Sequence, residues 1–422
     1  MSKRGRPSRM RRFLTVFIVL AAWSSSAVAE RQSGKVDASV ARLGALNVEE
    51  RALLAPHLAH GPVLLTEFKN RQTDLPAVIY AARIHAPATT IAGVIGKPAE
   101  YPRFMDALTS VDIREVNGQM TAFDWSWGVT LFSLTGQNVM TSYPGDSTRG
   151  YRFDIRTIAG DLGIGRVMWR VYPEGPNRSL VVFASRLDMR DANYITRQLA
   201  SEGNAVNRTV NVAVAMVTLL EVKAEAERRA GTSIDGVYAA KPLRRPQVDM
   251  YALRSLLSRG DLVFMDMDGK TLHSVAVVGR SGASERRVRR VMLDPEEFGK
   301  SLLHGTCAEV VERSERGTRF EWEIPIPLLH VGGEMILRPS PRVVSVDGIS
   351  GTLSKGRWRF DTYRYPGGEA GVIAWAIFDP ADSPKLIRKL IAGNTYFSHG
   401  FVAATQLAVM RSLRTRVHLL GR

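Results

Sequence analysis

The feature that most limits what this chain can fold into is an internal repeat. The triplet Phe123-Asp124-Trp125 recurs as Phe320-Glu321-Trp322, 197 residues later. Further matches keep the same order along the chain: Leu53 with Leu253, His60-Gly61 with Arg259-Gly260, Val94 with Val291, Pro98 with Pro295, Tyr101 with Phe298, Trp169-Arg170 with Trp358-Arg359, and Leu199 with Leu390. The offset drifts only between segments, as loop insertions and deletions would cause. We therefore predict two copies of one domain.

Each copy is predicted to end in a long amphipathic helix. Between Asn204 and Arg228 the apolar residues step by three or four positions, and Gly231 stops the pattern. This apolar stripe consists of Val206, Val210, Ala213, Val217, Leu220 and Ala224. A similar stripe closes the chain, with Tyr396, Gly400, Ala403, Leu407, Met410, Leu413, Val417 and Leu420. The two stripes predict a closing helix for each copy.

The segments before the first closing helix are mostly strand-like. Pro62–Phe68 and Ala77–His85 are predicted strands, followed by two short helical pieces, the second of which contains Tyr101 and Phe104. Alternating residues then predict strands at Met120–Trp127, Val129–Leu134, Tyr151–Ile155, Arg166–Tyr172 and Ser179–Arg186. The connections are too short for parallel crossovers, so we expect an antiparallel meander.

These elements give the predicted domain organisation. We expect a signal peptide at residues 1–29, a helical lead-in at 30–60 and a first domain at 61–231. A linker at 232–251 and a second domain at 252–422 follow. A curved antiparallel sheet can wrap its apolar face around one helix, so the fold class is α+β.

Three segments of the first copy carry a resemblance to a known superfamily. They are Ala86-Pro87-Ala88 after a strand, the Tyr101-Pro102 pair in a short helix, and Gly165–Trp169 before the long helix. Together they resemble the START-like (SRPBCC) superfamily, in its polyketide cyclase and coenzyme-Q-binding START-domain branch. The second copy departs from the pattern, with Gly279–Ala283 and Asp294–Phe298 at the matching places. The resemblance implies two helix-grip domains, each a curved sheet around its closing helix with two short helices after the first strand.

No group of residues with an evident catalytic role is found in the sequence. There is no G-x-S-x-G elbow, and Cys307, the single cysteine, is expected to be buried or half-buried. His57 and His60 lie three residues apart and are expected at the surface, so we predict no metal site and no cofactor. Asp124 and Glu321 should point away from the aromatic residues beside them, because neighbouring strand residues face opposite sides.

The aromatic residues are the remaining candidates for a site. If they converge beneath the closing helices, they would line an apolar cavity suited to a hydrophobic ligand, and small helix residues would leave room for it. The alternative is a filled core. The predicted ligand-binding residues are Tyr101, Phe104, Phe123, Trp125, Trp127, Trp169, Phe183, Val210, Ala213, Val217, Phe298, Phe320, Trp322, Trp358 and Trp375.

The N-terminus predicts export. The first 12 residues contain six basic residues and no acidic one, and the apolar run Phe13–Trp23 leads to Ala27-Val28-Ala29. This order is typical of a secretory signal peptide cleaved after Ala29, and a run of this length is too short to span a bilayer comfortably. A retained anchor is the alternative. Cleavage would leave a mature chain with a net charge of +10. We expect this mature protein to be periplasmic or secreted.

The charge pattern bears on possible partners. The densest basic group is Arg286–Arg290, which is either a solvated helix face or a surface attracted to anionic lipid headgroups. No nucleic-acid motif accompanies it. Three functions remain open: an exported carrier for a lipid, quinone or isoprenoid, a cyclase or aromatase acting on a polyketide-like substrate, and a scaffold with filled cores.

Overall fold

The computed structural model describes residues 43–68, 77–129, 132–161, 163–188, 204–232, 238, 241, 243, 246–300, 306–326, 329–365, 367–378, 382, 388 and 394–420. These residues belong to one compact unit, residues 42–422. The predicted signal peptide and the first part of the predicted lead-in lie outside the described residues.

All the strands of the described residues form one antiparallel sheet of 16 strands. The first copy contributes β1 (Val63–Glu67), β2 (Val78–Ile84), β3 (Leu108–Asn117), β4 (Met120–Val129), β5 (Phe132–Asp146), β6 (Gly150–Gly160), β7 (Ile164–Gly175) and β8 (Arg178–Asp188). The second contributes β9 (Gly260–Asp268), β10 (Thr271–Arg280), β11 (Cys307–Ser314), β12 (Gly317–Ile326), β13 (Leu329–Pro339), β14 (Val343–Gly351), β15 (Arg357–Arg364) and β16 (Ala370–Ile377).

The strand order shows the repeat directly. It runs β11-β12-β13-β14-β15-β16-β10-β9-β1-β2-β8-β7-β6-β5-β4-β3. Counted outward from the central pair β9 and β1, equivalent strands of the two copies follow in the same order. The predicted α+β helix-grip arrangement is confirmed for both copies. The sequence pattern did not reveal that the two sheets continue into one another.

The two copies are joined by main-chain pairing between β1 and β9. Leu64 pairs with Val263 in the antiparallel register. These two residues are repeat equivalents, because they lie 199 residues apart, the offset that also relates His60-Gly61 to Arg259-Gly260. Each copy thus covers the open edge of the other sheet, which would otherwise present unpaired N–H and C=O groups.

Each half of the sheet contains a pair of facing glycines. Gly136 pairs with Gly160 in the first copy, and Gly333 pairs with Gly351 in the second. In both copies an irregularity in the register follows within two residues, at 137/138 and at 334/335. Glycine and bulged positions are where a sheet can curve sharply. The same conditions for a sharp bend therefore occur twice, at matching places in the repeat.

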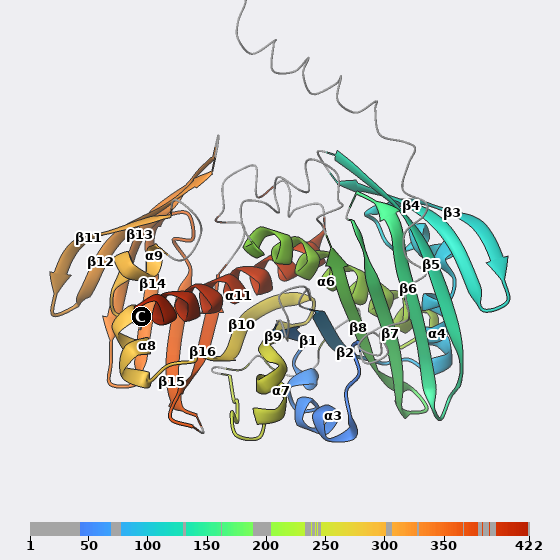
Figure 1. Cartoon of the computed structure of the whole chain (residues 1–422), viewed down its shortest axis with the longest axis horizontal. Coiled ribbons are helices and arrows are strands. Elements are labelled where there is room, and N and C mark those ends of the chain that lie inside the picture. The colour runs from blue at the N-terminus through green and yellow to red at the C-terminus, as the bar shows by residue number, and fades with distance from the viewer. Residues whose placement is uncertain are drawn as a thin grey trace, which may run out of the picture. The chain divides into compact units, whose positions relative to one another are not determined.

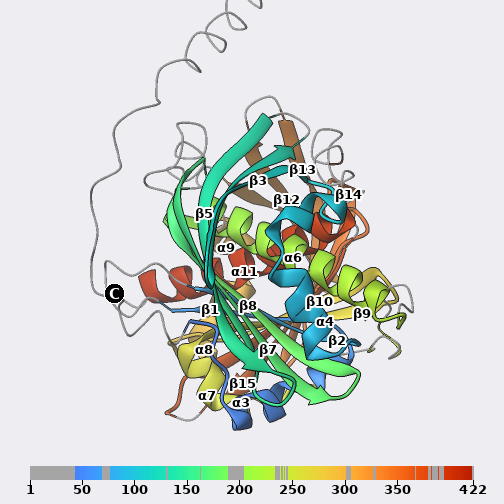
Figure 2. The ribbon, with the colours of Figure 1, turned by 90° about the vertical axis from the view of Figure 1, so that its right-hand side faces the viewer.

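The closing helices α6 (Asn204–Arg229) and α11 (Thr395–Leu419) confirm the helices predicted from the two stripes. Figures 1 and 2 show both on the concave side of the sheet. α6 packs on β2 and β8, and α11 packs on β9, β10 and β16. They also pack on each other, so a second surface of each helix is buried. No helix of the described ranges is long and apolar enough to cross a membrane.

The shorter helices cover the two faces of the sheet. On the inner face, which is also covered by α6 and α11, lie α4 (Ala88–Ile95), α8 (Glu285–Met292), α9 (Pro295–Gly299) and the 3-10 helix η2 (Pro98–Arg103). On the outer face lie α3 (Val48–Leu54), η1 (His57–Ala59) and α7 (Arg254–Arg259). Figure 1 shows α3 and α7 beside β1 and β9. A capping box begins α3: Asn47 Oδ1 accepts from the Glu50 N–H at 2.8 Å.

The buried side chains form two clusters, one on each face. The inner cluster contains Val263 and Met265 of β9, and the outer cluster contains Leu262 and Phe264, as strand alternation requires. The inner cluster continues through both copies and both closing helices. The central strands are therefore buried on both faces.

The two closing helices cross at very short range. A Cβ added to Gly400 of α11 would lie 2.6 Å from Ala213 Cα and 3.2 Å from the Ala213 carbonyl oxygen. Backbone atoms cannot yield as a side chain can, so a residue without a Cβ is needed at this point. The crossing depends on the small size of both residues.

We expect Gly400→Ala to lower the free energy of unfolding by about 1–3 kcal/mol, because the added methyl group overpacks the crossing. Gly93→Ala in α4 is the matched control: its Cβ would meet nothing within 4 Å. Removing a glycine from a helix should leave stability unchanged or raise it by up to about 1 kcal/mol. Chemical denaturation measures both. Equal effects of the two substitutions would contradict the close crossing.

Candidate functional site

Aromatic residues of the first copy meet on the inner face. Phe123, Trp169 and Phe183 are buried in the inner cluster, and the rings of Trp169 and Phe183 meet edge to face with centroids 4.6 Å apart. Tyr101 is also buried there, and the partly buried Phe104 packs edge-on against it at 5.9 Å. The structure therefore brings these five predicted residues together.

Tyr101 connects the two short helices of the first copy. Its hydroxyl donates to the carbonyl oxygen of Ile95, the last residue of α4. Burial raises the pKa of Tyr101, so the phenol stays protonated and keeps this hydrogen bond. The ring is thereby fixed with its apolar body in the inner cluster.

Trp125 and Trp127 occupy the inner face of β4 farther from the closing helix. Trp125 is partly buried and packs against the inner cluster, and a Cβ on Gly136 would lie 2.3 Å from its ring. The indole therefore lies against the bare backbone of β5 at the bend of the sheet. Trp127 is partly exposed and lies outside both hydrophobic clusters.

The second copy repeats this arrangement in part. Phe320 and Trp358 are buried in the inner cluster, and Phe298 and Trp322 pack against it. Ring contacts link these residues to their neighbours: Phe298 with Phe360, centroids 6.3 Å apart, and Trp358 with Phe378, 5.9 Å apart. Four of the five residues predicted for this copy thus lie on the inner face.

The prediction for Trp375 is wrong. On β16, Ala374 and Ala376 belong to the inner cluster, whereas Trp375 packs against the outer cluster on the opposite face. Both faces of this strand are buried, so an apolar segment such as Ala370–Ile377 shows no alternation that would reveal which way the tryptophan points. Sequence pattern alone could not decide its direction.

The small residues of α6 also need a different explanation. Ala213 belongs to the crossing with Gly400, where its size allows close approach of α11, so the reading of it as a cavity wall is wrong. Val217, one turn farther along the same side, is buried but belongs to neither hydrophobic cluster. The inner cluster instead takes Val212, Ala215, Met216 and Leu219. The side chain of Val210 lies outside the described part of the chain.

His57 and His60, which were expected at the surface, are each partly buried. The His57 ring stacks on Phe264 with centroids 4.0 Å apart, and burial together with the charge of His60 lowers the pKa of His57 to about 4. His60 Nδ1 lies 3.4 Å from Asp266 Oδ1. His57, His60 and Trp375 line a pocket of about 30 Å³ on the outer face. A pocket of this size has room for water rather than for a large ligand.

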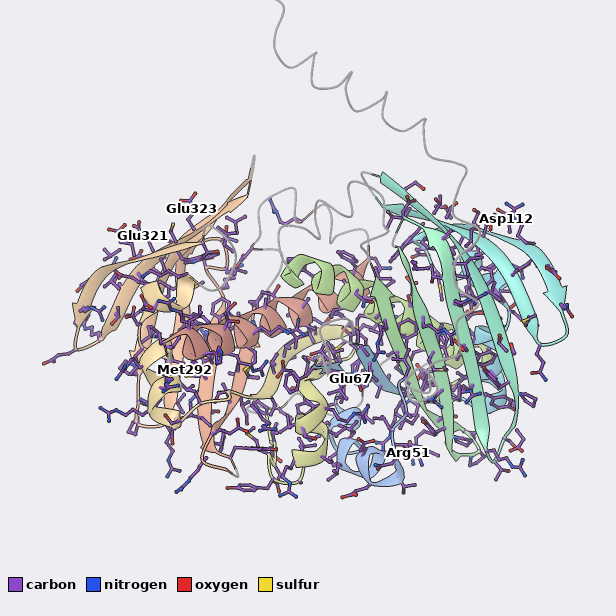
Figure 3. All side chains as sticks on the ribbon, viewed as in Figure 1. Arg51, Glu67, Asp112, Met292, Glu321 and Glu323 are labelled. Carbon is purple, nitrogen blue, oxygen red and sulfur yellow. The ribbon has the colours of Figure 1, made fainter. Side chains whose placement is uncertain are left out.

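The acidic residues and the cysteine that the sequence analysis considered for a chemical role lie away from the inner face. Asp124 forms an ion pair with Arg114, with Nε and Oδ2 2.7 Å apart, and Figure 3 shows Glu321 on the outer side of β12, as predicted. Cys307 is exposed at the start of edge strand β11, so its predicted burial is wrong. Within the described ranges, no three His, Cys, Asp or Glu side chains are placed to hold a metal.

Sequence reasoning missed a buried polar contact between the closing helices. Asn394 caps α11 by accepting from the N–H groups of Tyr396 and Phe397, and its Nδ2 donates to Glu221 Oε1 of α6 at 2.7 Å. Burial, together with the charge of Asp106, raises the pKa of Glu221 to about 7. The contact with Asn394 of α11 shows why this acidic residue is buried.

A buried ion pair lies farther along α6. Lys223 and Glu227 pair with both side chains only 3% exposed, and burial lowers the pKa of Lys223. Glu227 Oε1 also accepts from the His85 main-chain N–H at 2.9 Å, which connects the helix to the end of β2. This half of α6 is thus fixed by polar contacts as well as by its apolar residues in the inner cluster.

Comparisons with known proteins return similar folds only among solved structures. No protein-family model and no curated protein matches the chain. The Zhui aromatase/cyclase from Streptomyces sp. R1128 is 18% identical, with 36% of this chain and 94% of that chain covered and a TM-score of 0.31. The di-domain ARO/CYC StfQ from the steffimycin biosynthetic pathway is 11% identical, with coverages of 81% and 99% and a TM-score of 0.29.

A third similar structure is a STAR-related lipid transfer protein from Xanthomonas axonopodis. It is 14% identical, with 38% of this chain and 90% of that chain covered and a TM-score of 0.29. START-related proteins are thus among the solved structures that match. At these identities the likeness concerns the fold.

The raised pKa of Glu221 predicts a pH-dependent stability. Between its usual value of 4.5 and about 7, the folded protein holds a proton that the unfolded chain has lost. The contribution of Glu221 is therefore complete below 4.5 and declines as pH rises through about 7. We expect Glu221→Gln to remove this decline, since the amide oxygen still accepts from Asn394.

Thermal unfolding of the wild type and the variant at pH values from about 5 to about 8 measures this difference. Glu225→Gln is the control on the same helix, because hydrogen bonds from Arg228 and Arg229 lower the pKa of Glu225. The Glu225→Gln variant should still lose stability as the pH rises. Parallel pH profiles for the wild type and Glu221→Gln would show that the burial of Glu221 is not coupled to its protonation.

Proposed function

We propose that this protein is an exported carrier that binds an apolar small molecule or lipid on the inner faces of its two sheets. The observation that carries the proposal is the state of three tryptophans. Trp125, Trp127 and Trp322 point to the inner face, and yet they stay partly exposed while the neighbouring Phe123 and Phe320 are buried.

The placement of these tryptophans supports binding rather than simple core packing. α6 packs on β2 and β8, whereas Trp125 and Trp127 lie on β4, at the other end of the same half-sheet. Large apolar side chains that keep contact with water offer a surface that an apolar ligand would dehydrate favourably. The absence of a side chain at Gly136 lets the Trp125 ring lie against the backbone of β5.

Export and membrane contact form part of the same proposal. The predicted signal peptide would direct the protein to the periplasm or outside the cell. Arg286, Arg287 and Arg290 are exposed on α8, while Val288 and Met292 are buried on its other side; Figure 3 labels Met292. Such a basic face would be attracted to anionic lipid headgroups, from which a carrier could load its ligand.

We expect Trp125→Leu to weaken the binding of N-phenyl-1-naphthylamine, an uncharged apolar fluorophore, by several-fold, because part of the binding surface is lost. Trp375→Leu is the matched control: it also removes a half-buried tryptophan, but from the outer face. Its affinity for the fluorophore should equal that of the wild type. Fluorescence titration of the full mature chain measures both.

Native mass spectrometry of the protein purified from cells should in addition show a bound apolar molecule. The proposal would be contradicted by wild-type protein that neither binds the fluorophore nor carries such a molecule. Equal losses of affinity in the two tryptophan variants would also contradict it, because the ligand would then not distinguish the two faces of the sheet.

A further inference from the structure

A buried amide without a partner lies in the second copy. Gln406 of α11 is 0% exposed, and neither its Oε1 nor its Nε2 has a hydrogen-bond partner in the structure. Val402 and Met410, one turn before and after it, both belong to the inner cluster. The amide therefore points to the inner face. Leaving such a group unpaired inside the protein is destabilising, so a hydrogen-bond partner is expected there.

The first copy has no amide at this position. α6 and α11 begin 191 residues apart, and at this offset Gln406 corresponds to Ala215. The neighbouring positions correspond as apolar pairs of the inner cluster: Val212 with Ala403, Met216 with Leu407, Leu219 with Met410, and Val222 with Leu413. The equivalence is thus supported on both sides of Gln406. The second copy therefore has the amide of Gln406 at the position where the first copy has the methyl group of Ala215.

A second unpaired group lies on the sheet of the same copy. Trp322 Nε1 is buried and has no hydrogen-bond partner in the structure. In the first copy the equivalent Trp125 Nε1 lies 3.3 Å from the side-chain oxygen of Asn138, with that amide oriented to suit its neighbours. Asn138 pairs with Phe123 in the sheet, as Met335 pairs with Phe320. The second copy has therefore lost the acceptor of its tryptophan.

These two differences point to one kind of ligand. Trp322 Nε1 and Gln406 Nε2 are both buried donors without an acceptor. Trp322 packs against the inner cluster, and the residues one turn before and after Gln406 belong to it. We propose that the second copy binds an apolar molecule with an uncharged carbonyl group, of the ketone, ester or amide class, and that Gln406 donates to that carbonyl. This inference rests on the proposed function. A charged group would cost far more to bury among apolar side chains.

The first copy would differ in its ligand preference. Its tryptophan is already paired with Asn138, and Ala215 offers no hydrogen bond. A purely apolar molecule suits that surface. The two copies would then share a shape and differ in the polar group that they recognise.

The experiment compares 2-acetylnaphthalene with 2-ethylnaphthalene, two molecules of nearly equal shape of which only the first has a carbonyl. We expect the full mature chain to bind the ketone about 10-fold or more tightly than the hydrocarbon, since one well-made hydrogen bond in an apolar site is worth that factor or more. Gln406→Leu should abolish this preference and leave the affinity for 2-ethylnaphthalene unchanged. Tryptophan fluorescence quenching gives both dissociation constants.

Asn211→Leu is the matched control, because Asn211 is also a buried amide on a closing helix but accepts from the Ser185 hydroxyl at 2.7 Å. This variant should keep the preference for the ketone. Without ligand, Asn211→Leu should lower the unfolding temperature, whereas Gln406→Leu should not, because no hydrogen bond is lost.

The outcomes separate this inference from the proposed function. If both naphthalenes bind but Gln406→Leu retains the preference, or if the wild type shows none, the amide pairs with buried water and the inference is wrong. If neither naphthalene binds to the wild type, the proposed function fails and the inference fails with it.

Discussion

The main-chain pairing of β1 with β9 is the interaction on which the rest of the structure depends. It turns two half-sheets into one and places the two closing helices on the same face, where they cross. Because Leu64 pairs with its own repeat equivalent Val263, the contact is self-complementary, like the interface of a symmetric dimer. The crossing of Gly400 with Ala213 and the capping contact between Asn394 and Glu221 follow from this arrangement.

The same pairing explains which parts of the fold could be predicted from the sequence. The repeat and both closing helices were predictable, because Phe123-Asp124-Trp125 recurs and the helical stripes are long. The direction of Trp375 and the true sheet-facing side of α6 were not. Central strands and helices buried on two sides lack the contrast between apolar and polar residues that reveals a face. Where the two copies meet, both sides of an element are buried, and the sequence pattern there does not show which side faces the sheet.

The candidate site was predictable in outline only. Most of the predicted aromatic residues do lie on the inner face, since Trp125 and Trp322 follow the alternation of strands that are covered on one side. Glu221 and Gln406 were not predicted, because a buried polar residue in a helix looks the same in sequence as a solvated one. The comparison between copies provides the missing signal, and it needs the structure to establish which residues correspond.

The two copies divide into a part that fixes shape and a part that varies in chemistry. The facing glycines at 136/160 and 333/351, the irregular register beside them and the tryptophans that lie there occur in both. These features depend on backbone geometry, which tolerates few alternatives. The hydrogen-bonding groups around them have changed: Asn138 corresponds to Met335, and Ala215 to Gln406. A duplicated domain can keep its curved surface through glycine while its polar groups change one at a time. Ligand preference can then differ between copies without a change of fold.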